Sequence, residues 1–127
     1  MTIAVDTSFL VDVLRKHGPA VELLRSYVRK DEHLVGSIIV RAEILAGMRP
    51  REEARTRQLL GLIQWEPVME PESETAGELG RKHLPANTGI DTPDLLIAEV
   101  ALRFSAPLVT SNLKHFKSLI PGVDALY

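Results

Sequence analysis

The chain has 127 residues, of which 45% are hydrophobic, and a formal net charge of −2 at pH 7. A chain of this length buries roughly two-thirds of its unfolded surface, so we expect a single domain spanning residues 1–127. There is no cysteine, which excludes disulfides, thiolate zinc sites and cysteine nucleophiles. The net charge gives no strong general attraction to nucleic acid, so any basic surface has to be local.

The sequence shows no sign of membrane insertion or secretion. Its apolar runs fall far short of the roughly 20 residues that a membrane span needs. The N-terminus reaches an acid at Asp6 and has no charged-then-apolar signal pattern. We therefore expect a soluble cytoplasmic protein with no membrane association.

Short apolar segments alternate with helical patterns along the chain. The expected strands are 3–6, 34–36, 65–69, 107–110 and 123–127. The expected helices are 8–17, 19–28, 38–45, 50–64, 72–84, 94–104 and 112–119, with an Asn-Thr-Gly loop after residue 84. Thr7 or Ser8 is expected to cap the first helix and Gly18 to stop it. Short strands separated by helices favour an α/β fold of three layers, with a central parallel sheet between helices.

Asp6 follows the first expected strand directly. In parallel sheets, ligands gather beyond the carboxyl ends of the strands, and the pair Ser111-Asn112 follows another expected strand. Asp6 could instead cap the first helix. Because Thr7 and Ser8 already offer caps there, we interpret Asp6 as a functional residue.

Glu43 lies in a nearly continuous apolar segment, Ile38–Ala46. A helix that is apolar on almost all sides is expected to be buried. The alternative is that Arg41 and Glu43 share a solvent-facing stripe, but they lie about 200° apart around a helix. One of the two should therefore face inward or into a cleft.

Asp94 begins an expected helix immediately after Pro93. The helix dipole favours an acid in this first turn without any further function. Asp91 has a similar explanation, as a helix cap. Position alone leaves both interpretations of Asp94 open.

Three acids in apolar settings suggest a bound cation. Burying an unpaired carboxylate costs several kcal/mol or more. A divalent ion between Asp6, Glu43 and Asp94 would offset that cost, and oxygen-only ligands favour Mg²⁺ or Mn²⁺. The pattern indicates metal-dependent phosphodiester chemistry.

Other charged and apolar groups are weaker candidates. Asp12 is expected to pair with Lys16 on a solvated helix face. Favourable spacings between acids and arginines predict a salt-bridged, exposed helix near residues 49–57. The groups best placed to contact a nucleic-acid backbone are Lys114, His115 and Lys117. Trp65 and the stripe formed by Leu59, Leu60, Leu62 and Ile63 are expected in the core or an interface.

Four segments carry a family resemblance across the chain. They are Val5–Ser8, Ile39–Ile44, Pro93–Ala98 and Leu108–Asn112, the last followed by Phe116. In this order they resemble a PIN-domain ribonuclease, and the size and motif order look like the bacterial VapC-type toxins. The resemblance implies a short central parallel sheet flanked by helices, with a cluster of acids that holds Mg²⁺ or Mn²⁺.

The resemblance also assigns roles to residues. By position, Asp6, Glu43 and Asp94 match the three most characteristic acids of the family. The family usually adds a fourth acid near 110–116, where this chain has Asn112 and His115 instead. Asn112 could still supply a neutral oxygen ligand, but a second metal would be held more weakly.

The implied reaction is metal-assisted hydrolysis of an RNA phosphodiester bond. Asp6 and Asp94 would be direct metal ligands, and Glu43 would bind through water or orient the nucleophile. VapC-like proteins are also expected to form homodimers and to be held inactive by a small antitoxin that places a basic side chain in the acidic site.

Rival interpretations follow from the same residues. The missing fourth acid leaves open a catalytically weak or inactive PIN-like binding module. A phospho-receiver domain is disfavoured because the strand at 65–69 ends in Met-Glu-Pro. An aspartyl-phosphate phosphatase is disfavoured because Ser8 stands where the second aspartate is needed.

Overall fold

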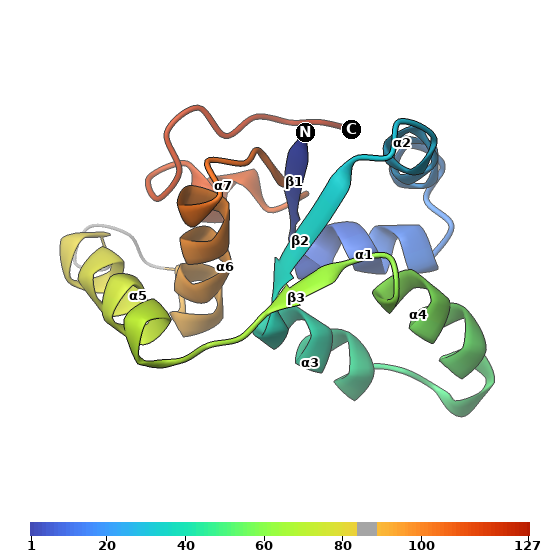
Figure 1. Cartoon of the computed structure of the whole chain (residues 1–127), viewed down its shortest axis with the longest axis horizontal. Helices are drawn as coiled ribbons and strands as arrows, with labels where there is room; N and C mark the ends of the chain where they lie inside the picture. The colour runs from blue at the N-terminus through green and yellow to red at the C-terminus, as the bar shows by residue number, and fades with distance from the viewer. Residues whose placement is uncertain (84–88) are drawn as a thin grey trace.

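The structure, a computed structural model, describes residues 1–83 and 89–127. Its sheet has four parallel strands in the order β3-β2-β1-β4 (Figure 1). They are β1 (Thr2–Val5), β2 (His33–Ser37), β3 (Gln64–Glu66) and β4 (Leu108–Val109). In register, Ile3 lies opposite Leu34 and Val5 opposite Val109. Because the strands are parallel, their carboxyl ends meet at one edge of the sheet.

Helices cover both faces of this sheet, as the sequence pattern predicts. They are α1 (Thr7–Leu14), α2 (Gly18–Arg29), α3 (Ile38–Ala46), the 3-10 helix η1 (Pro50–Glu52), α4 (Glu53–Leu60), α5 (Glu70–His83), α6 (Thr92–Arg103) and α7 (Leu113–Phe116). Figure 1 shows α5 and α6 on one side of the sheet and α1, α2 and α4 on the other. The expected three-layer α/β/α fold is confirmed.

The beginning and end of α1 differ from the prediction. Asp6, rather than Thr7 or Ser8, is the cap: its carboxylate accepts a hydrogen bond from the backbone N–H of Thr7 at 2.7 Å. The helix ends at Leu14, because Lys16 takes a left-handed conformation with φ of 61°. Gly18 therefore opens α2 instead of stopping α1.

Other expected elements also differ from the structure. The expected strand at 65–69 is β3 at Gln64–Glu66, and the expected helix at 112–119 ends at Phe116. The fourth expected helix ends at Leu60 rather than residue 64, because Gln64 already pairs in β3. The expected strand at 123–127 is absent from the described structure. There the ring of Tyr127 packs against Phe9, with ring centroids 5.5 Å apart. The expected end of a helix at Leu84 and most of the Asn-Thr-Gly loop lie outside the described residues.

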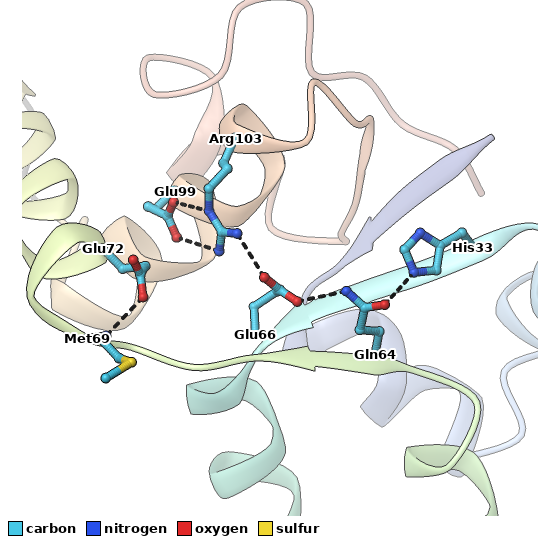
Figure 2. Close-up of polar contacts among 7 residues, drawn as sticks. All are labelled: His33, Gln64, Glu66, Met69, Glu72, Glu99 and Arg103. Carbon is cyan, nitrogen blue, oxygen red and sulfur yellow. Dashed lines mark hydrogen bonds and ion pairs between the residues drawn. The ribbon is translucent and has the colours of Figure 1, made fainter.

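A polar network fastens α6 to the edge of the sheet (Figure 2). Arg103 donates to Glu99 on its own helix at 2.7 and 3.3 Å, and to Glu66 of β3 at 2.8 Å. Glu66 also accepts from Gln64 at 2.8 Å, and Gln64 contacts a ring nitrogen of His33 at 2.9 Å. Since Glu99 is only 4% exposed, the guanidinium compensates a carboxylate that is removed from water.

The apolar core lies between the sheet and its helices. Phe9, Phe116 and Val35 are fully buried within it. The predicted stripe divides: Leu59, Leu60 and Ile63 are buried, whereas Leu62 is 48% exposed. Trp65 packs against the core and donates its indole N–H to the carbonyl of Leu60 at 3.0 Å. None of the helices in the described part of the chain has both the length and the apolar character needed to cross a membrane.

Candidate active site

The carboxyl ends of β1 and β4 open into a cleft of about 390 Å³. Asp6, Glu43, Asp94 and Asn112 all line it, so the four site residues predicted from the sequence share one cavity. They come from four separate segments: the end of β1, helix α3, the start of α6 and the start of α7. The parallel topology is what brings such distant positions together.

Asp6 is the most buried acid of the cleft, with 3% of its surface exposed. Besides capping α1, its carboxylate accepts hydrogen bonds from the hydroxyls of Ser8 at 2.8 Å and Thr110 at 2.5 Å. These bonds offset the cost of burying the charge. Asp6 thus caps α1 and also lines the cleft. The sequence-based interpretation that Thr7 and Ser8 make Asp6 unnecessary as a cap was wrong.

The two hydroxyls that hold Asp6 also join the strand ends. Ser8 and Thr110 lie 3.1 Å apart, and each accepts a backbone N–H, from Ser111 and Asn112 respectively, at 2.9 Å. From the sequence, Ser8 was interpreted as a cap and as part of a family motif, and neither Ser8 nor Thr110 was identified as a hydrogen-bond partner of Asp6. The available signal was a hydroxyl residue at the end of a strand that neighbours the strand of Asp6.

Glu43 stands at the rim of the cleft and is exposed. One of its carboxylate oxygens accepts the hydroxyl of Thr7 at 2.7 Å. The expectation that α3 is buried on all sides was wrong, because only Val40 and Ile44 of this helix are buried. The expectation that Arg41 or Glu43 faces a cleft is confirmed: Glu43 lines the acidic cleft and Arg41 a different hollow.

Asp94 and Asp91 cap α6 reciprocally. Asp91 accepts from the backbone N–H of Asp94 at 3.1 Å, and Asp94 accepts from that of Asp91 at 3.3 Å. The pKa of Asp94 is raised to about 6, chiefly because burial disfavours its charged form; the backbone hydrogen bond from Asp91 acts to lower this pKa and the charge of Asp91 to raise it. A cation near Asp94 would favour its charged form.

His115 occupies the region where the fourth acid of the family was expected. Its Nδ1 lies 3.2 Å from a carboxylate oxygen of Asp94. The contact is an ion pair when the imidazole is protonated and a hydrogen bond when neutral His115 carries its hydrogen on Nδ1. The side chain predicted to contact phosphate therefore touches a proposed metal ligand.

Two further residues line the cleft, Asp12 of α1 and Arg15 directly after α1, and neither was identified as a site residue from the sequence. Asp12 lines the cleft and accepts the hydroxyl of Tyr127 at 2.6 Å, so its predicted pairing with Lys16 was wrong. Arg15 lines the cleft one turn further on. With Ser8 they follow the i, i+4, i+7 spacing of one helix face, a signal that was present in the sequence.

The donors of the cleft suit a hard divalent cation. One carboxylate oxygen of Glu43 and one of Asp94 receive no hydrogen bond from any residue that the structure describes. Oxygen donors of this kind favour Mg²⁺ or Mn²⁺ over softer metals. Within residues 1–83 and 89–127, however, no three acidic or histidine side chains gather closely enough to hold an ion ready-made. To bind an ion, these side chains would have to rotate into the cleft, or water molecules would have to bridge the side chains to the ion.

Comparison with known proteins identifies the fold family. The model of the PIN domain family matches residues 3–119. The chain belongs to the PIN-domain family. Over 123 residues, this PIN domain is 36% identical to ribonuclease VapC19 of Mycobacterium tuberculosis, a match that covers 97% of the chain and 98% of that protein. It is 33% identical to ribonuclease VapC10 of the same species over 114 residues, covering 90% and 85% respectively.

Solved structures agree with the family. A toxin–antitoxin complex from Klebsiella pneumoniae superposes with a TM-score of 0.80 at 24% identity, covering 98% of both chains. VapBC2 from Rickettsia felis, bound to a DNA fragment of its promoter, gives a TM-score of 0.76 at 25% identity, covering 94% of this PIN domain and 93% of the matched chain. The resemblance drawn from four short motifs is confirmed.

Proposed function

We propose that this PIN domain is an endoribonuclease dependent on Mg²⁺ or Mn²⁺ that hydrolyses RNA phosphodiester bonds as the toxin of a toxin–antitoxin pair. The observation that supports this best is the shared cleft of Asp6, Glu43 and Asp94 at the carboxyl edge of the sheet. The names of the M. tuberculosis relatives, both ribonucleases, agree with that chemistry.

Four residues of the cleft have parts in the proposed reaction. A divalent cation bound there would supply Lewis acidity toward the attacking water and the phosphate. Asp6 and Asp94 would hold it. Glu43, at the open rim with an unengaged oxygen, orients the attacking water or binds through one. Asn112 contributes a neutral oxygen.

A buried and a half-buried acid in one cleft also explain why the substrate needs the cation. A phosphodiester is itself an anion, so it is repelled by Asp6 and Asp94 until a positive charge lies between them. Metal and RNA should therefore bind cooperatively.

We place this activity in the cytoplasm, within a single domain of residues 1–127.

The proposed partners are a small antitoxin and a second copy of the chain. A hollow of about 470 Å³ exposes apolar side chains between α1, α2 and α4, and Leu62 and Leu24 line it. An antitoxin segment docked there would cover this apolar surface. A basic side chain of the antitoxin could then enter the acidic cleft in place of the metal.

A cleavage assay tests the activity. The purified chain is incubated with a labelled single-stranded RNA and Mn²⁺, with EDTA as the control. We expect cleavage that EDTA abolishes and that the Asp6→Asn variant lacks. Cleavage that persists in EDTA, or in the folded Asp6→Asn variant, would refute the proposal.

The alternative function is a catalytically weak or inactive PIN-like binding module. Two observations favour it: Asn112 and His115 replace the fourth acid, and the described side chains form no closed metal-binding group. In the same assay this module would bind RNA without cutting it at any Mn²⁺ concentration.

A further inference from the structure

A second hollow adjoins the acidic cleft beside the C-terminal end of α1. This second hollow has a volume of about 360 Å³ and extends to the loop between α3 and η1. Both cavities are lined by Val11, Arg15 and Glu43. The two cavities are therefore neighbours, and together they extend from Asp6 to Arg49. This pair of adjoining cavities is called the groove.

The second hollow differs in character from the acidic end of the groove. Its walls combine apolar side chains with polar and charged ones. They are Val11, Leu14, Arg15, Glu43, Ile44, Gly47, Met48, Arg49, Glu52 and Thr56. A mixture of apolar walls with a few charged groups is typical of a ligand site, and the volume falls within the usual range for one.

Arg15 stands at the junction of the two cavities. It is exposed, and within the described residues its guanidinium has no ion pair or hydrogen-bond partner. By contrast, Arg57 pairs with Glu53 at 3.0 Å and Arg103 with Glu66 at 2.8 Å. An arginine without a partner, at the mouth of a phosphate-processing site, has the charge and the forked geometry to grip a phosphate.

Arg49, at the outer end of the groove, is a second side chain that can contact an anion. Its side chain is 72% exposed and reaches Glu52 only at 4.0 Å, so it retains most of its capacity for an anion. Two arginines, Arg15 and Arg49, and two acids, Glu43 and Glu52, line the second hollow, so its formal charge is balanced. What it offers an anion is therefore the individual guanidinium groups of Arg15 and Arg49, not a basic patch.

We propose that this groove binds single-stranded RNA across two nucleotides, with Arg15 gripping the phosphate next to the one that is cleaved. The neighbouring nucleotide occupies the second hollow, and Arg49 lies beside the next phosphate. The assignment rests on the proposed function, because the acidic cleft is taken as the place of cleavage. Arg15 is a positioning residue here, since it touches the substrate away from the reacting bond.

The test measures RNA binding separately from cleavage. A fluorescent single-stranded oligoribonucleotide is titrated with the Asp6→Asn variant, and with the same variant carrying Arg15→Gln, Arg15→Lys or Arg29→Gln, at several salt concentrations. Arg29 is exposed at the end of α2 and lines neither cavity. It is thus a matched control for the loss of one positive charge.

We expect Arg15→Gln to weaken binding about tenfold and to lower the slope of log affinity against log salt by about 0.7. Arg15→Lys should recover most of the slope and part of the affinity, because lysine keeps the charge without the fork. Arg29→Gln should change neither quantity. Equal affinities and slopes for the Arg15→Gln and Arg29→Gln variants would overturn the proposal.

A second measurement locates the phosphate and separates this inference from the proposed function. In the wild-type cleavage assay, single phosphates are replaced in turn by neutral methylphosphonates. One phosphate adjacent to the scissile bond should be sensitive in the wild type and insensitive in Arg15→Gln. If the wild type binds RNA through Arg15 but never cleaves it, the proposed function fails and the groove remains. If cleavage is intact in Arg15→Gln with unchanged phosphate sensitivity, the groove assignment fails alone.

Discussion

The hydroxyl of Thr110, after β4, donates a hydrogen bond to the carboxylate of Asp6, after β1, across 104 positions of the chain. The bond links neighbouring strands at the edge where the candidate site lies. It also fixes one orientation of the most buried acid in the cleft. Partners of this kind orient metal ligands and tune metal affinity.

Replacing Thr110 by valine should therefore weaken the site without removing any ligand. The change keeps the shape but deletes the donor to Asp6 and the acceptor for the N–H of Asn112. We expect Mn²⁺ affinity to fall about 10- to 100-fold and stability to fall by about 1–3 kcal/mol. Calorimetric Mn²⁺ titration and chemical denaturation measure the two effects. Thr75→Val, on the exposed face of α5, is the control; equal Mn²⁺ affinity in both variants would contradict the account.

Glu43, at the rim of the cleft, and Asp94, a proposed direct metal ligand, should respond differently when their charge is removed. Asp94→Asn deletes a proposed direct ligand, so both Mn²⁺ affinity and the cleavage rate should collapse. Glu43→Gln should leave Mn²⁺ affinity within about tenfold while lowering kcat more strongly, because Glu43 acts through water. Calorimetry and steady-state cleavage kinetics give the comparison. A loss of metal binding in Glu43→Gln as large as in Asp94→Asn would make Glu43 a direct ligand instead.

The close approach of Trp65 to Gly36 gives a prediction for the sheet. A Cβ atom added at Gly36 would lie 2.8 Å from a ring carbon of Trp65 and 3.1 Å from a methyl of Val5. Gly36→Ala should thus cost about 1–3 kcal/mol of unfolding free energy. Gly77→Ala meets nothing within 4 Å on α5 and should be neutral or stabilising by up to about 1 kcal/mol. Urea denaturation measures the unfolding free energy of both variants. A Gly36→Ala protein as stable as wild type would show that the indole of Trp65 moves freely away from the added methyl group.

Glu66 predicts part of the acid sensitivity of the fold. Its pKa is lowered from the ordinary value of a glutamate, first because Arg103 donates to its carboxylate and second because Gln64 does. A carboxyl group with a lowered folded-state pKa contributes stability that is complete above its unfolded pKa and is lost as pH falls through the folded value. Wild type should therefore lose more stability than Glu66→Gln between about pH 5 and pH 3.

The matched control for that comparison is Glu22→Gln. Glu22 pairs with Arg25 at 2.8 Å, but both side chains are more than 60% exposed, so solvent screens the pair. Denaturation curves at several pH values should leave Glu22→Gln parallel to wild type. If the stability of Glu66→Gln also changes with pH in parallel with that of wild type, the network of Figure 2 adds no pH dependence to stability.

Much of the fold was predictable because local signals and burial agree. Ser37 caps α3 as its sequence position suggests, and Gly47 follows the last helical residue. The predicted strand at 123–127 fails for a tertiary reason. Tyr127 lies against Phe9 and donates to Asp12, so its apolar ring is accounted for by packing onto α1 and not by strand pairing.

The site shows where sequence reasoning stops. A charged residue in an apolar segment is conspicuous in a sequence, and this is how Asp6, Glu43 and Asp94 were identified. Thr110 and Arg15 carry a weaker signal, because a threonine directly after a strand and an arginine that shares a helix face with Ser8 and Asp12 are both common among residues without a function. Their importance arises from which segments the parallel sheet and α1 bring to one edge, and that requires coordinates.

Diffraction at the manganese absorption edge, from a crystal of the protein soaked in Mn²⁺, tests the central claim most directly. The account predicts an anomalous peak in the cleft, within ligand distance of Asp6 and Asp94. A protein that cleaves RNA under the same Mn²⁺ conditions yet shows no peak between these two carboxylates would contradict it.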